Sequence, residues 1–381
     1  MKIIKVSKDI THQFFQFLSR LVTNEKLYEG ALLIFIGCIF ISFHDLIARF
    51  HETPFDGVFQ TLFALRKMDA GEFPGRDFFY FHGNGIPYLL YPIYWILHKL
   101  TGQELSSSLW STFIINIIFL YGPIYVFFLK KYGRRYAASA LLIISLINEF
   151  LFFFGFYNSP LFIGAPMGVR LAPHLLVLFT FSIYIKEKND VNFKKSLYVL
   201  GMLLGVSALI AAEQGVFAIL GSFFAIVLIE NTWRDKLKNS FILLSVSVLT
   251  FLTLQLVLFG GFDSIRAMKI ISDNQVWVYG VFPNVFFANI YEVFSFSKVL
   301  AIPSQITTLL ASIVVFILAV EKKRNPIYLI SIFAMYFGGM ISWISNIGYV
   351  GQHQSAIFMK LLIIVALVFI FDKCKQENEQ K

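Results

Sequence analysis

The sequence predicts an all-α fold, a polytopic transmembrane helical bundle of about ten spans. The first observation is composition: 57% of the 381 residues are hydrophobic and 14% are charged, whereas soluble domains carry about 25% charged residues. The second is that apolar runs of the roughly 20 residues needed to cross a bilayer recur along the chain. The third is that short loops bearing Lys or Arg separate these runs. The net charge of +9 is therefore spread over small clusters, and no nucleic-acid-binding patch is expected.

The expected organisation is a basic cytoplasmic arm (1–28), a transmembrane domain (29–371) and a cytoplasmic tail (372–381). The arm is typical of an interfacial helix rather than a cleavable signal, because no A-x-A-like site follows it. Two cysteines, one in an apolar run and one in the tail, imply no disulfide framework. The runs long enough to cross are 29–47, 109–129, 137–156, 171–187, 196–212, 214–230, 240–260, 299–320, 326–345 and 353–371.

A further apolar run, 86–100, decides the orientation of all later spans. It holds two prolines together with His98 and Lys99, and it is short for a span. If it does not cross, 22 of the 32 Lys and Arg residues fall on one side, which the positive-inside rule identifies as the cytoplasm. Residues 48–108 then form one long external loop, in which 86–100 lies at the interface or dips in and out.

The external loop has its own sequence pattern. Asp56 follows Pro54 and begins a stretch in which Phe59 and Phe63 supply an apolar face. The stretch ends at Gly71, after which proline and glycine turn the chain. We expect an amphipathic helix lying on the membrane, followed by a structured loop.

These residues resemble the C-type superfamily of membrane glycosyltransferases, which includes protein O-mannosyltransferases and aminoarabinose transferases. The resemblance is carried by Asp56-Gly57, by 64–66, by Gly71 to Phe78, and by His82-Gly83-Asn84-Gly85 leading to Tyr88. Segments 158–170 and 212–215 also look similar to the family, and the last third of the chain resembles it only in hydropathy. The second member of the family's adjacent acid pair is absent, because glycine follows Asp56.

The resemblance implies an inverting glycosyltransferase that moves a sugar from a polyprenyl-phosphate carrier to a lipid or glycan acceptor, on the external face of a bacterial inner membrane. Such transfer needs a carboxylate to take the acceptor's proton and cations or a metal to stabilise the departing phosphate. Asp56 is the candidate base or a helix cap. Asp77 is a second candidate catalytic acid that binds a metal or the sugar, or it simply pairs with Arg76. A divalent metal, Mg²⁺ or Mn²⁺, would take Asp56 and Asp77 as ligands, and its requirement stays open.

Several other polar residues are candidates for binding the donor. His82 contacts phosphate or sugar, or makes a structural hydrogen bond. Arg170 lies at the depth of lipid phosphates, where it either binds one or snorkels from a helix end. Lys360 and Glu149 fall within spans, so they either pair with each other or place the lysine near the donor phosphate. The remaining candidates are Arg76, Glu213, Arg266, Lys269 and His353.

The alternative hypotheses are a polytopic transporter or flippase and a polymerase or ligase for lipid-linked saccharides. A transporter predicts ionisable or helix-breaking groups near mid-membrane and two similar halves. The spans here are mostly Leu, Ile and Phe, and the halves show no visible symmetry. The sequence therefore favours the enzyme.

Overall fold

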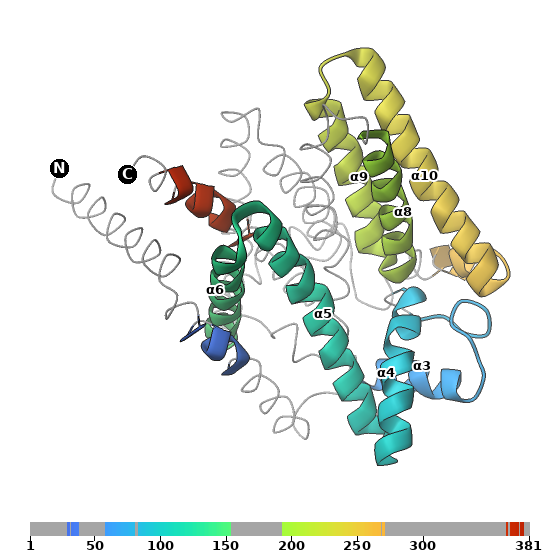
Figure 1. Cartoon of the computed structure of the whole chain (residues 1–381). Helices are drawn as coiled ribbons and strands as arrows, with labels where there is room; N and C mark the ends of the chain where they lie inside the picture. The colour runs from blue at the N-terminus through green and yellow to red at the C-terminus, as the bar shows by residue number, and fades with distance from the viewer. Residues whose placement is uncertain are drawn as a thin grey trace, which may run out of the picture.

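The computed structural model describes residues 29–30, 32–37, 58–80, 83–153, 193–267, 269–270, 363–364, 366–372 and 374–376. Within these ranges the chain is overwhelmingly helical and forms no strand (Figure 1); its one strand-like contact is an isolated bridge between Pro74 and Phe78. The predicted all-α class is confirmed for this part of the chain.

Two groups of long helices dominate the described structure. In the first, α5 (Glu104–Tyr132) and α6 (Arg134–Phe153) pack side by side and are joined through Gly133. In the second, α8 (Phe193–Ile210), α9 (Ala212–Ile229) and α10 (Trp233–Phe259) form the three-helix unit visible in Figure 1. These helices coincide with five of the predicted apolar runs.

The close contact between α8 and α10 depends on two glycines of α8. A Cβ atom on Gly201 would lie 2.8 Å from the Val246 side chain, and one on Gly205 would lie 2.6 Å from the Ser247 carbonyl oxygen. Small residues let apolar helices approach each other closely, as they do in membrane proteins. The two glycines therefore fix the interface on which the three-helix unit is built.

Among the described helices, α5 and α10 are long and apolar enough to cross a membrane. Most of the apolar surface of α10 is unburied within the protein, with Leu249 62% and Val257 72% exposed. Such a surface suits contact with lipid. The structure therefore supports a membrane protein, while the predicted number of ten spans includes the runs 171–187, 299–320 and 326–345, which lie outside the described residues.

The apolar cores divide the molecule into two regions. The larger core joins α5, chiefly its second half, to α6, α8, α9, Leu243 of α10 and four C-terminal residues: Ile364, Leu367, Val368 and Phe371. The smaller core is built from α3 (Val58–Asp69), α4 (Gly85–Thr101) and the first half of α5. Helix α5 therefore connects the main bundle to a compact unit made by the predicted external loop.

Contacts at the helix ends bring together segments that are distant in the sequence. Gly83 packs on the end of α8 at Ile210, and Tyr88 stacks on Phe259 at the end of α10. At the opposite end of α5, the Tyr132 hydroxyl donates a hydrogen bond to Asp372 (2.7 Å). The loop therefore lies beside the ends of α8 and α10, and the tail lies beside the end of α5. The side of the membrane that each of them faces stays a prediction.

Candidate functional site

The loop between α3 and α4 is shaped by its glycines. Helix α3 ends where Gly71 takes a positive φ of 87°, and Gly75, with φ 83°, forms the turn that brings Arg76 and Asp77 back toward Phe73. The turn is closed by the Gly75 amide donating to the Phe78 carbonyl (2.6 Å) and by the Asp77 amide donating to the Phe73 carbonyl (2.9 Å). Only glycine adopts such φ values without strain. The structured loop predicted after Gly71, with its turn at Pro74-Gly75, is therefore confirmed.

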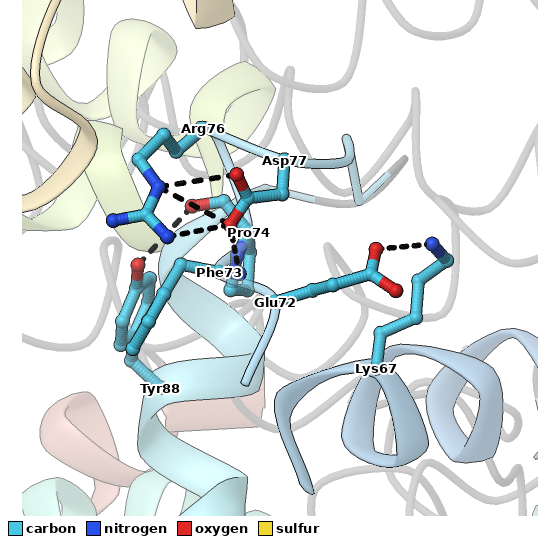
Figure 2. A network of polar contacts seen from close by, with 7 residues as sticks. All are labelled: Lys67, Glu72, Phe73, Pro74, Arg76, Asp77 and Tyr88. Carbon is cyan, nitrogen blue, oxygen red and sulfur yellow. Dashed lines mark hydrogen bonds and ion pairs between the residues drawn. The ribbon is translucent and has the colours of Figure 1, made fainter. Parts of the chain in front are cut away.

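Arg76 and Asp77 form the central ion pair of this loop (Figure 2). The Arg76 Nη2 atom lies 2.8 Å from Asp77 Oδ2, and Nε lies 3.1 Å from both carboxylate oxygens. The Phe73 amide also donates to Asp77 Oδ2 (2.7 Å), and the guanidinium lies over the Phe73 ring at 4.7 Å. Asp77 therefore pairs with Arg76, and its role in binding a metal or sugar stays a prediction.

The pair has a defined charge state. Hydrogen bonds from the Arg76 guanidinium, and next from the Phe73 amide, lower the pKa of Asp77, while the same carboxylate raises the pKa of Arg76. Asp77 is therefore an anion at neutral pH and is a weak proton acceptor. An ionised carboxylate of this kind suits the orientation of a cation or a hydroxyl group better than general base catalysis.

A second ion pair borders the loop. Lys67 of α3 pairs with Glu72, and its ammonium group lies 5.3 Å from the Phe63 ring centroid and 5.4 Å from that of Phe78. Phe63 is 57% exposed, whereas Phe78 is buried. The loop therefore presents Arg76 and Lys67 beside aromatic rings. Basic and aromatic side chains together suit the headgroup region of a membrane.

The far end of the loop is fixed to the bundle by backbone contacts. The Asn84 side chain is buried and accepts a hydrogen bond from the Tyr80 amide (2.8 Å). A Cβ atom on Gly83 would lie 2.0 Å from the Ile210 carbonyl oxygen and 3.2 Å from Ala211 Cα. The loop therefore lies directly against the break between α8 and α9.

Tyr88 connects the loop to α10. Its hydroxyl donates to the Pro74 carbonyl (3.2 Å), and its ring stacks on Phe259 with a centroid distance of 6.0 Å. Burial raises the pKa of Tyr88, so its hydroxyl remains a donor at neutral pH. Figure 2 shows the hydrogen bond between Tyr88 and Pro74. Together with the stacking on Phe259, it holds the turn at Pro74 against the end of α10.

The predicted site residues divide into three groups. Arg76 and Asp77 are brought together in the loop, and Glu213 lies in the first turn of α9, two residues after the Ala211 contact. Arg266 and Lys269 are exposed beyond the end of α10. The other candidates lie outside the described residues: Asp56, His82, Arg170, His353 and Lys360. Their roles stay predictions.

A further polar cluster was not expected from the sequence. Asp69 of α3 accepts a hydrogen bond from the Tyr91 hydroxyl (3.4 Å) and lies 3.7 Å from His98, while Arg66 pairs with Glu104 of α5 (2.7 Å). These partners lie on three helices and are separated by 22 to 38 residues of sequence. No local motif connects them, so sequence reasoning could not find the cluster.

Of the two acids predicted to bind a metal, Asp77 lies in the described part of the chain and Asp56 lies outside it. Among the residues that the structure describes, no group of three or more His, Cys, Asp and Glu side chains is placed to hold a metal ion. A requirement for Mg²⁺ or Mn²⁺ therefore stays a prediction from the sequence.

Comparison with known proteins gives no further guidance. No protein family, curated protein or solved structure matches the chain. The functional hypothesis therefore rests on this chain's own residues and their packing.

Proposed function

We propose that the protein is a membrane glycosyltransferase that moves a sugar from a polyprenyl-phosphate carrier to a lipid or glycan acceptor, with inversion. One observation supports this most directly: the loop that carries Arg76 and Asp77 packs on the break between α8 and α9, beside the first turn that holds Glu213. Two separate segments that resemble the glycosyltransferase superfamily thus meet at one end of the helical unit. In this proposal, a lipid-anchored substrate reaches the site at this end of the helices.

The loop offers part of the chemistry that such a transfer needs. The departing phosphate carries negative charge, and preorganised cations lower the barrier by stabilising it. The Arg76 guanidinium is held by Asp77 and by the Phe73 ring, while its side chain stays 53% exposed. It can therefore meet a phosphate without reorganising, and in this proposal Arg76 is a donor-binding residue.

The proton acceptor in this proposal is Asp56. It precedes α3 in the sequence, whose described part begins at Val58. Asp77 suits this role less well, because its pKa is lowered by Arg76 and its oxygens already accept several hydrogen bonds. The two acids therefore have different tasks: Asp56 accepts the proton and Asp77 orients Arg76.

The proposed location is a bacterial inner membrane, with the loop on the periplasmic or extracellular face. The apolar surfaces of α5 and α10 support insertion in a bilayer. The grouping of the loop away from the basic α5–α6 connection is consistent with the positive-inside rule.

The test is turnover of polyprenyl-phosphate sugars by the purified protein in liposomes. We expect Asp56→Asn to lower turnover by at least about 100-fold, the usual contribution of a general base. Asp235→Asn is the matched control, because Asp235 lies at the opposite end of α10, where it interacts with Thr232. This control should stay within about twofold of the parent, a change of under roughly 0.5 kcal/mol in the barrier.

Two results would contradict different parts of the proposal. Near-normal turnover by Asp56→Asn would remove Asp56 as the base while leaving the enzyme class intact. Movement of the lipid-linked sugar across the bilayer without transfer to any acceptor would instead identify a flippase.

A further inference from the structure

The first turns of α10 carry an exposed apolar stripe. Trp233, Leu237 and Phe241 are spaced four residues apart, so they lie on one face of the helix. Their exposed fractions are 73%, 67% and 71%. Three large apolar side chains therefore stand side by side, uncovered by the part of the chain that the structure describes.

Two cations lie in the neighbouring row of the same helix. Arg234 and Lys238 each follow a residue of the apolar stripe, are one turn apart and are exposed. Among the described residues, neither side chain has a hydrogen-bond or ion-pair partner. A third cation, Lys236, places its ammonium group 5.1 Å from the centroid of the Trp233 ring. The stripe is therefore flanked by basic groups, two of which can take an anionic partner.

The acids nearest in the sequence are engaged elsewhere. Asp235 caps the helix: its amide donates to Thr232 Oγ1 (3.1 Å), and the Thr232 hydroxyl donates to Asp235 Oδ2 (2.7 Å). Glu230 is buried and accepts a hydrogen bond from the side chain of Asn239 (3.2 Å), which lies on the buried side of α10. The three cations therefore exceed the one exposed carboxylate, and the exposed side of this helix end carries a net positive charge.

The length of α10 puts this basic end at the depth of lipid headgroups. A helix of 27 residues is about 40 Å long, whereas the hydrocarbon core of a bilayer is about 30 Å thick. The apolar run 240–260 accounts for the core, and residues 233–239 extend beyond it. Tryptophan and basic side chains prefer this depth. The stripe also continues into the exposed apolar surface of α10, which includes Val248 and Leu249.

We propose that the start of α10 binds an anionic phospholipid of the surrounding membrane. Arg234 and Lys238 contact the phosphate of its headgroup, while the apolar stripe packs against the glycerol and the upper part of the acyl chains. Basic and apolar side chains that act together hold a charged lipid surface more firmly than either kind alone. Each Lys or Arg close to an anionic membrane surface strengthens binding by about fivefold. This site requires no glycosyltransferase activity, so it does not rest on the proposed function.

The test follows the fluorescence of Trp233 in the full-length protein in phosphatidylcholine vesicles. One preparation contains a minor fraction of phosphatidylglycerol brominated near the glycerol end of an acyl chain. The other contains the same fraction of phosphatidylcholine brominated at the same place. Bromine quenches the fluorescence of a tryptophan that it contacts. The chain has five tryptophans, so the Trp233 signal of each protein is its difference from the same protein with Trp233→Phe.

We expect the brominated phosphatidylglycerol to bind beside Trp233 about five- to tenfold more strongly than the phosphatidylcholine. In the double variant Arg234→Gln/Lys238→Gln, the two lipids should bind within about twofold of each other. Glutamine is a good helix former, so the variant keeps α10. The matched control is Lys130→Gln/Arg134→Gln, which removes two exposed cations from the α5–α6 connection and should leave the preference at Trp233 unchanged.

Four results would overturn the proposal. Absence of quenching by either lipid would show that the stripe does not touch the membrane. Equal quenching by both lipids in the parent would show an apolar contact without recognition of the headgroup. A preference that survives in Arg234→Gln/Lys238→Gln would show that these cations do not bind the lipid. An equal loss of preference in the control would assign the effect to the overall surface charge.

Discussion

Replacement of Gly83 by alanine is the most stringent test of how the loop is attached to the bundle. The added Cβ atom would lie 2.0 Å from the Ile210 carbonyl oxygen and 2.8 Å from its carbon. Ordinary carbon–oxygen contacts are about 3.3 Å or longer, so the loop and the end of α8 would have to separate by more than about 1 Å. The residue also has φ 134°, which alanine adopts only with strain.

The free-energy cost of Gly83→Ala is the sum of the backbone strain and the steric contact with Ile210. Backbone strain of this kind costs about 1–3 kcal/mol, and overpacking of a tight contact costs about as much again. The sum, about 2–6 kcal/mol, is a large fraction of the roughly 5–15 kcal/mol that stabilises a typical folded domain. We therefore expect Gly83→Ala to release the loop from α8 or to unfold the protein at a markedly lower temperature.

The assay is thermal unfolding in detergent, followed by size-exclusion chromatography. Gly102→Ala is the matched control, because Gly102 also has a positive φ (68°) but has no atom within 4 Å of the added Cβ. The Gly102→Ala variant therefore suffers only the backbone strain, about 1–2 kcal/mol. Equal melting temperatures for the two variants would show that the contact with Ile210 is absent and would refute the reasoning.

Two other predictions concern the same loop. Gly75→Ala places a Cβ atom 2.6 Å from the Phe259 ring, so Phe259→Ala should relieve part of its destabilisation in the double variant; strictly additive losses in melting temperature would contradict this contact. Asp77 has a lowered pKa, chiefly because of Arg76, so its contribution to stability is present above about pH 4 and is lost as the pH falls through its folded-state value. In urea or thermal unfolding, the difference in stability between Asp77→Asn and the parent should be constant from about pH 5 to 8 and should shrink in stronger acid. If the difference in stability grows in acid, the ionised Asp77 carboxylate is not its cause.

Local patterns predict most of the described secondary structure. The apolar run 109–129 lies within α5, and 240–260 coincides with most of α10. Both helices extend beyond the apolar run at their polar ends, and the first turns of α5 contain Ser107 and Ser108, which are buried. Hydropathy identifies the part of a helix that suits lipid. It does not identify the polar turns at a helix end that become buried in the tertiary structure.

The candidate site was only partly predictable. Arg76 and Asp77 are neighbours in the sequence, so their pairing could be anticipated, and the glycines mark the turn that presents them. The contact of Gly83 with Ile210 joins residues far apart in the chain. No periodicity indicates which helix end a loop will meet, because that choice depends on the packing of all the helices together.

By itself, the sequence determined the helical class, the affinity for lipid, the main helix positions and the polar loop after α3. These properties depend on composition, period and turn residues, which act over a few neighbouring positions. Tertiary structure alone decided that the loop lies on the α8–α9 break and that Asp69 meets His98 across 29 residues of sequence. Such contacts arise because distant helices bury their apolar faces together, and the polar groups at the edges are brought together as a consequence.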